Sequence, residues 1–515
     1  MHLRIRTTRI VTTASALVVL AAASLTTALT ASGSAATGEE TLTADPLATW
    51  QTDGIVWSLA YARGVVYVGG TFGNVRPPGA KPGEKEVARK NFAAFDAVTG
   101  KLLPCTHSFW GAEDTVRALK ASPDGKVLFV GGSFSRVGRA AVANTVALNT
   151  ADCSLRNDFR PAVSATVRAI ETTDTAVYLG GEFTTVKGQT RNYIASLSPS
   201  GSLLPFKAAI DRPVRAIAAA HKHGKVIVGG DFDKVNGAKT HALVGLNPST
   251  GSTVSSYPSW IPRRSVVKAL GRDGTNFYVG AEGNGTGIFD GRIAGRLSDD
   301  KMVWKDTCWG ATQAVVPYNG VLYSGSHAHD CNNTPGGFPE LNDRQHFLAN
   351  SLRDKKILHW FPDTNGGTGE GQGPRALVMA GKILWAGGEF TAVNERPQQS
   401  LTRFAAAPDT GAPEAAPQLR IADSRAGKVT LAWRAAWDRD DAVLTYLIYR
   451  DGVRVASRTQ RSAAWDRPNM KYTDSIPSGS RHQYTIAVTD GENASAKSAP
   501  LEVTAAVADK QPTGE

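Results

Sequence analysis

Short apolar runs that end in glycine recur along most of the chain, separated by polar and turn-forming residues. Seven of them share one pattern, in which three mostly apolar residues precede one or two glycines, with first glycines 45–62 residues apart: Val66–Gly70, Leu128–Gly132, Val177–Gly181, Val226–Gly230, Phe277–Gly280, Leu322–Gly325 and Leu384–Gly388. Repeats of about 50 residues are typical of propellers and solenoids. No segment shows a sustained helical period, so the pattern predicts an all-β protein.

Each repeat reads as four short strands. In residues 116–159, a first apolar strand is followed by the turn Pro123-Asp-Gly125, a second strand at 126–130, a third at 142–148 and a fourth that ends at Phe159. Seven four-stranded units predict a closed, seven-bladed β-propeller over residues 46–405. Because an open ring would leave unpaired edges, we expect residues near 46–52 to complete the last blade beside 401–404.

The glycines of the motif have two structural explanations. A missing Cβ lets neighbouring backbones approach closely, and glycine also adopts φ/ψ values that other residues avoid. The recurring pattern Val-Arg-Ala-Leu … Asp-Gly-Lys … Val-Gly-Gly-x-Phe resembles the delta-60-type β-propeller repeats of secreted bacterial proteins, although Gly280-Ala281 and Gly325-Ser326 depart from it. This resemblance implies a fold and no single shared activity.

A second domain follows a linker at residues 406–416, where prolines and small residues predominate. Alternating strands then carry Trp433, Tyr446-x-x-Tyr449-Arg-Asp-Gly452, Pro477-x-Gly479 and Tyr484. These features resemble a fibronectin type III domain over residues 417–506, in which Trp433 is a core residue and Tyr484 takes the tyrosine-corner position. Residues 507–515 are expected to be a disordered tail.

The N-terminal 36 residues have the composition of an export signal. Arg4, Arg6 and Arg9 precede an uncharged apolar stretch, and Ser34-Ala-Ala36 offers a cleavage site; the alternative is an uncleaved membrane anchor. Removal of this segment takes away three arginines and no acidic residue, which lowers the formal charge from +11 to +8. The remaining basic residues are scattered, so we expect no nucleic-acid partner. No other stretch is apolar and long enough to cross a bilayer, so we expect no stable membrane insertion after cleavage.

Four cysteines, Cys105, Cys153, Cys308 and Cys331, suit an exported protein with two disulfides. Three pairings are open. We expect Cys105–Cys153 and Cys308–Cys331, because the members of each pair lie in neighbouring repeats.

The strongest candidate for chemistry is Ser326-His-Ala-His-Asp-Cys331, together with His346. On a strand, His327 and His329 would share one face. His327, His329 and Asp330 are therefore candidate catalytic residues, and His327, His329 and His346 are candidate ligands of a divalent metal. The alternative, which we favour, is a structural loop held by Cys331, and we expect no cofactor.

Charged and aromatic residues offer further candidates. Four arginines of the first strands recur with three acids that follow the double glycines: Arg117, Arg168, Arg215 and Arg375, with Glu182, Asp231 and Glu389. We interpret them as structural ion pairs. The functional alternative is an acid-lined channel mouth for a sugar or a cation. Trp309 lies outside the register of the core aromatics and is a candidate ligand-binding residue. The run Asp438–Asp441 lacks the spacing of a calcium loop and favours a solvated loop.

The sequence contains no G-x-S-x-G, H-E-x-x-H, P-loop or dinucleotide motif. We therefore expect a secreted, monomeric binding or scaffold protein of bacterial type, whose propeller presents a ligand face to an extracellular glycan or a cell-surface protein and whose second domain acts as a spacer. The alternative is an extracellular glycosidase or lyase that acts on polysaccharides.

Overall fold

A computed structural model describes residues 39–414 and 417–507. The expected signal segment at 1–36 and the tail from 508 onward lie outside the described residues. The described chain is all-β, as predicted, and its only helix is one short 3-10 turn, η1 (His221–His223). None of the described residues forms a helix that is long and apolar enough to span a membrane.

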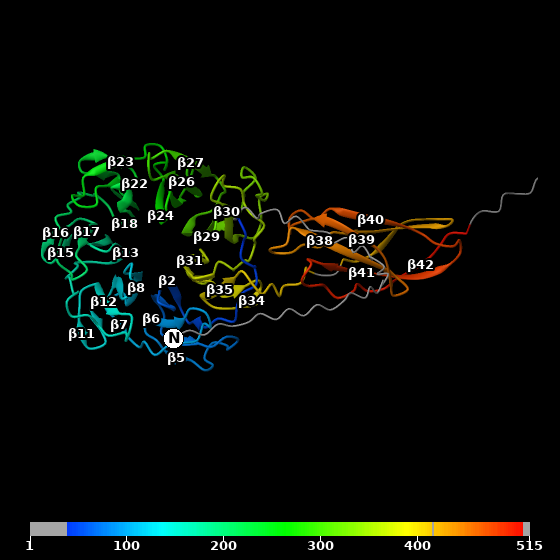
Figure 1. The fold of residues 1–515 in the computed structure, drawn as a ribbon, viewed down its shortest axis with the longest axis horizontal. Helices are drawn as coiled ribbons and strands as arrows, with labels where there is room; N and C mark the ends of the chain where they lie inside the picture. Colours follow the sequence, from blue (N-terminus) through cyan, green and yellow to red (C-terminus); the bar gives the residue numbers. More distant parts are fainter. Residues whose placement is uncertain (1–38, 415–416, 508–515) are drawn as a thin grey trace, which may run out of the picture. The chain divides into compact units, whose positions relative to one another are not determined.

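Successive segments of the chain build a propeller of antiparallel sheets (Figure 1). Within residues 39–414 there are seven such sheets, numbered here in chain order, and the first three are β2 (Ile55–Ala62), β3 (Val65–Thr71) and β6 (Phe92–Asp96); β8 (Thr115–Ala121), β9 (Val127–Ser133) and β12 (Thr145–Asn149); β13 (Val167–Thr172), β14 (Val177–Gly181) and β17 (Ile194–Leu197).

The fourth and fifth sheets have four strands each, and the sixth and seventh have three. They are β18 (Val214–Ala220), β19 (Lys225–Gly230), β22 (Leu243–Leu246) and β23 (Thr253–Ser256); β24 (Ser265–Arg272), β25 (Asn276–Gly283), β26 (Arg292–Arg296) and β27 (Met302–Asp306); β28 (Thr312–Tyr318), β29 (Val321–Ala328) and β30 (Gln345–Ser351); β31 (Pro374–Ala380), β32 (Ile383–Gly388) and β35 (Leu401–Ala405).

The expected fourth strand is thus complete in two sheets only. Elsewhere it is reduced to single bridges, such as Phe95 with Leu102 and Leu197 with Leu203. Pro104 and Pro205 follow these two bridges by two residues. The bridges of Leu148 with Leu155 and of Asn350 with Ile357 are equally short without a proline in the next four residues, so proline alone does not explain the reduction.

The first strands of the sheets surround the axis and form a closed cycle. Each contacts the first strand of the next sheet, and β31 of the seventh sheet contacts β2 of the first. Five further small sheets, of two or three short strands each, accompany these seven sheets: β1 (Gln51–Thr52), β4 (Asn74–Arg76) and β5 (Val87–Ala88); β7 (Phe109–Trp110), β10 (Arg136–Val137) and β11 (Ala140–Ala141); β15 (Thr185–Val186) and β16 (Gln189–Thr190); β20 (Lys234–Val235) and β21 (Ala238–Lys239); β33 (Ala392–Val393) and β34 (Arg396–Pro397).

The motif glycines are required for this close packing. A Cβ on Gly180 would lie 2.5 Å from Cγ1 of Val214 in the next sheet, and a Cβ on Gly387 would lie 2.3 Å from Cγ1 of Val56 across the ring closure. The first of the two predicted reasons, close approach, is therefore confirmed. The second is wrong, because none of the seven motifs contains a glycine with positive φ.

The N-terminal segment completes the seventh sheet at Leu47, within the expected range, and the contact begins earlier in the chain, at Thr43. The backbone N–H groups of Thr43 and Leu47 donate to the carbonyls of Ala405 and Arg403 in β35, both at 2.8 Å. Leu42 and Ala44 are buried beside Phe404 in the same core cluster. Covering the outer edge of β35 removes an unpaired strand edge.

The C-terminal region is a sandwich of two antiparallel sheets. One contains β36 (Arg420–Arg425), β37 (Lys428–Arg434) and β40 (Asn469–Ser475); the other contains β39 (Val453–Arg461), β38 (Val443–Arg450), β41 (Arg481–Thr489) and β42 (Leu501–Thr504). Trp433, Tyr446 and Tyr484 are fully buried in its core. The Tyr484 hydroxyl donates to the carboxylate of Asp474 at 2.6 Å, whereas a tyrosine corner binds backbone.

Candidate functional site

Every first strand of the propeller carries a β-bulge at the same position. The register shifts there by one residue, which leaves one side chain per sheet out of the ladder: Trp57, Arg117, Arg168, Arg215, Lys268, Gln313 and Arg375. A bulge re-aims the side chain that it leaves unpaired. The residue after each bulge is a small one, alanine or serine, and it lines the axial cavity. The bulges thereby gather mostly polar side chains at one end of the ring.

We call this end the axial mouth, defined by the seven bulge residues and by the carboxylates that contact them or follow the double-glycine positions, namely Glu182, Asp231, Glu282, Glu370 and Glu389. The mouth opens into an axial cavity of about 620 Å³. Below the bulges the wall is an apolar collar made of one branched side chain per sheet: Leu59, Leu119, Ile170, Ile217, Leu270, Val315 and Leu377. Tyr61, Ser122 and Arg272 line the cavity toward the opposite end of the first strands.

Three of the predicted arginine–acid pairs are confirmed at the mouth. Arg168 contacts Glu182 at 2.6 Å, and Arg215 binds both carboxylate oxygens of Asp231 at 2.6 Å. Arg375 contacts the fully buried Glu389 at 2.8 Å. In each pair, the acid follows the second glycine of the same sheet, so the repeat itself positions both partners.

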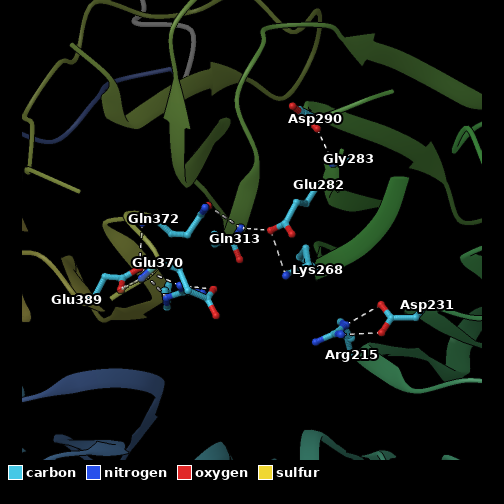
Figure 2. A network of polar contacts seen from close by, with 11 residues as sticks. Arg215, Asp231, Lys268, Glu282, Gly283, Asp290, Gln313, Glu370, Gln372 and Glu389 are labelled. Carbon is cyan, nitrogen blue, oxygen red and sulfur yellow. Dashed lines mark hydrogen bonds and ion pairs between the residues drawn. The ribbon is translucent and has the colours of Figure 1, made fainter. Parts of the chain in front are cut away.

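The fifth, sixth and seventh sheets continue this network through glutamates, glutamines, a lysine and an arginine (Figure 2). Glu282 accepts from Lys268 at 3.0 Å and from Gln313 at 2.6 Å. Although burial opposes its charge, Lys268 and Gln313 hold the pKa of Glu282 below its ordinary value. Gln313 also donates to Gln372 at 3.0 Å. Glu370, whose side chain is 73 % exposed, contacts Arg375 at 2.8 Å.

Arg117 is the exception among the arginines. Ser133 occupies the place of the acid in its sheet. Among the described residues, no hydrogen-bond or ion-pair partner binds its guanidinium, and its buried Nε has no acceptor. The guanidinium lies over the Trp57 ring, 3.9 Å from the centroid. Burial, followed by the positive charge of Arg168, lowers its pKa to about 10.

The predicted histidine site is distributed over separate partners. His329 Nδ1 contacts Glu340 at 2.8 Å, and the buried His346 uses its Nδ1 to contact Asp363 at 3.1 Å. His327 lies on β29, where burial lowers its pKa. The register shift between Gly325 and Ala328 interrupts the regular strand on which a shared face for His327 and His329 depends.

Asp330 accepts from the backbone N–H of Asn332 at 3.0 Å and forms a bridge with Trp309, whose side chain is 41 % exposed. Within the described ranges, the groups that could hold one cation contain no histidine. The catalytic and metal roles of His327, His329, Asp330 and His346, and the ligand role of Trp309, therefore stay predictions.

Both expected disulfides, Cys105–Cys153 and Cys308–Cys331, are present. The second one anchors the loop that carries His329 and Asp330, as the structural interpretation of this loop expects.

The aspartate run in the sandwich differs from the expected solvated loop. Asp438 is 5 % exposed and accepts from the backbone N–H groups of Asp440 and Asp441. Two overlapping groups, Asp409 with Asp441 and Asp490 and Asp438 with Asp440 and Asp441, lie close enough to share a cation. Burial, followed by the neighbouring Asp438, raises the pKa of Asp440 to about 8.

Comparisons with known proteins give one short family match and distant structural likenesses. Residues 177–203 match a family described as a domain of unknown function (DUF5122) beta-propeller. The chain is similar in structure to a chain of the mitotic checkpoint complex (12 % identity, 71 % of this chain, 93 % of the other, TM-score 0.45) and to Saccharomyces cerevisiae Sqt1 (9 % identity, 72 % of this chain, all of the other, TM-score 0.42). No curated protein matches the sequence.

Proposed function

We propose that the protein is a secreted binding or scaffold protein of bacterial type that holds an extracellular glycan or a cell-surface protein at the axial mouth. The observation that carries this proposal is the row of seven bulges, because it gathers one side chain per sheet around a cavity of about 620 Å³. Cavities of about 300–1,000 Å³ with a few convergent polar groups are typical of ligand sites. The two disulfides are compatible with an oxidising, extracellular location.

The finer architecture belongs to the same proposal. The seven sheets are taken as the blades of a seven-bladed propeller, and the C-terminal sandwich as a fibronectin type III domain that acts as a spacer. The protein is expected to act as a monomer. Neither the comparisons nor the described residues favour the alternative glycosidase or lyase activity.

The proposal is tested by screening the purified, full-length protein on an array of extracellular glycans and cell-surface proteins, with reducing-sugar detection on every glycan that binds. Binding without the release of reducing ends is the expected result. Release of reducing ends would favour the hydrolase instead, and absence of binding to every glycan and protein on the array would refute the proposed function.

A further inference from the structure

Arg117 is a charged group at the axial mouth, and no carboxylate among the described residues forms an ion pair with it. Arg168, Arg215 and Arg375 each contact a carboxylate, whereas the sheet that carries Arg117 has Ser133 at the acid position. A buried donor without an acceptor costs about 1–3 kcal/mol, and more when the donor is charged. A ligand that provides the missing anion would explain why Arg117 has no carboxylate partner.

The guanidinium is also held in place for such a ligand. Trp57 lies in the sheet between those of Arg117 and Arg375, and both guanidinium groups lie over its ring, 3.9 Å and 4.7 Å from the centroid. The indole Nε1 donates to Thr71 Oγ1 at 2.9 Å, which fixes the ring. Stacking of this type orients the planar donors of arginine, which match the geometry of a carboxylate. Arg117 and Trp57 both line the cavity.

Two carboxylates beside the fifth and seventh sheets add complementary chemistry to the mouth. Glu282 and Glu370 present carboxylate oxygens, with side chains that are 34 % and 73 % exposed. These oxygens accept hydrogen bonds from hydroxyl groups, but they repel a ligand of high negative charge. The mouth therefore favours one carboxylate combined with several hydroxyls over a phosphate or a sulfate.

We propose that the axial mouth binds an acidic sugar, with the uronate carboxylate on Arg117 and the sugar hydroxyls on the Glu282 and Glu370 side. This inference rests on the proposed function and names its ligand class. The carboxylate replaces the acid that the second sheet lacks.

The repeat itself supplies a matched test. Ser133→Asp places an acid at the position that Glu182 and Asp231 occupy in the next two sheets, where it should pair with Arg117. Titration calorimetry on the full chain with D-glucuronate, and with D-glucose as the neutral control, measures the effect. We expect D-glucuronate to bind at least 10-fold more tightly than D-glucose, and S133D to weaken glucuronate binding about 10- to 100-fold.

Two further variants separate binding from folding. Arg117→Gln should weaken D-glucuronate binding to the same extent without lowering the thermal midpoint, because it removes a charged side chain whose buried Nε has no acceptor. Arg136→Gln makes the same chemical change on the exposed β10 and should leave binding unchanged. Binding that is equal for D-glucose, or that persists in both S133D and R117Q, would overturn the inference.

Titrations with two other anions, inorganic phosphate and a peptide with a free C-terminal carboxylate, test the choice of ligand class. If either binds more tightly than D-glucuronate, the assignment to an acidic sugar is overturned. Array ligands that bind S133D as well as they bind the unchanged protein would refute this inference and leave the proposed function intact.

Discussion

The ion pair of Arg292 and Asp306 predicts a large loss of stability when its cation is removed. Both side chains have no solvent exposure. Arg292 donates to Asp306 Oδ2 from Nε at 2.9 Å and from Nη2 at 2.6 Å. Asp306 also accepts from Thr334 Oγ1 at 2.6 Å, from Asn350 Nδ2 at 3.2 Å and from the Cys308 N–H at 3.0 Å.

The magnitude follows from what Arg292→Met leaves behind. Asp306 would keep three neutral donors but lose its only counter-charge among the described residues, in a site without water contact. Breaking a buried pair in this way costs about 3–5 kcal/mol. That is a large fraction of a typical stability of about 5–15 kcal/mol. Asp306→Asn should cost a similar amount, because it leaves the buried guanidinium of Arg292 without its counter-charge.

Urea unfolding, followed by tryptophan fluorescence, measures this difference. Arg296→Met is the matched control, because Arg296 lies on the same strand, β26, and forms an exposed pair with Asp299 at 3.0 Å. Exposed pairs contribute about 0–1 kcal/mol. An R292M variant whose unfolding free energy is within 1 kcal/mol of that of R296M would refute the assignment of a buried, charge-dependent network.

Three further predictions concern packing, closure and pH. Gly180→Ala should lower the free energy of unfolding by about 1–3 kcal/mol, because its Cβ would overlap Val214, whereas Gly274→Ala has open space and should change it little; denaturant titration compares them. Deletion of residues 39–47 should lower the thermal midpoint by calorimetry, since it uncovers β35; an unchanged midpoint would contradict ring closure by this segment. Asp440, with its pKa raised to about 8 from an unfolded value near 4, contributes stability that is complete below pH 4 and is lost as the pH rises through 8. The midpoint should therefore fall between pH 5 and 8, and less steeply in Asp440→Asn; equal slopes would contradict the shift.

Much of the propeller could be predicted because its determinants repeat. The spacing of the double glycines identifies second strands, and the close approach of Gly180 to Val214 explains why they recur. The fourth strands were predicted less well, because the turn residues that predict them do not determine how many residues pair, and four of them are single bridges. The N-terminal edge contact was expected near 46–52; the backbone bond of Leu47 lies within that range, and the bond of Thr43 extends the contact toward the N-terminus.

The candidate site was predicted in part for the same reason. The pairs of Arg168, Arg215 and Arg375 follow from equivalent repeat positions, which the sequence displays. The exception, Arg117, was detectable as an arginine whose repeat has Ser133 instead of an acid, but its burial and its contact with Trp57 depend on the bulges. The contact of Arg292 with Asp306 depends on the register of β26 with β27, which residue types alone do not determine.

The position of the bound ligand tests the central claim most directly, because the account places it at the axial mouth rather than at the opposite end of the cavity. All four cysteines are in disulfides, so a cysteine introduced as Gln313→Cys or Tyr61→Cys can be labelled selectively with a bulky maleimide. Gln313 lies at the mouth, and Tyr61 lines the cavity four residues beyond the first bulge. Using the array ligand that binds best, we predict that labelled Q313C loses binding at least 10-fold and that labelled Y61C retains it. Equal binding by the two labelled proteins, or loss in Y61C alone, would contradict the account.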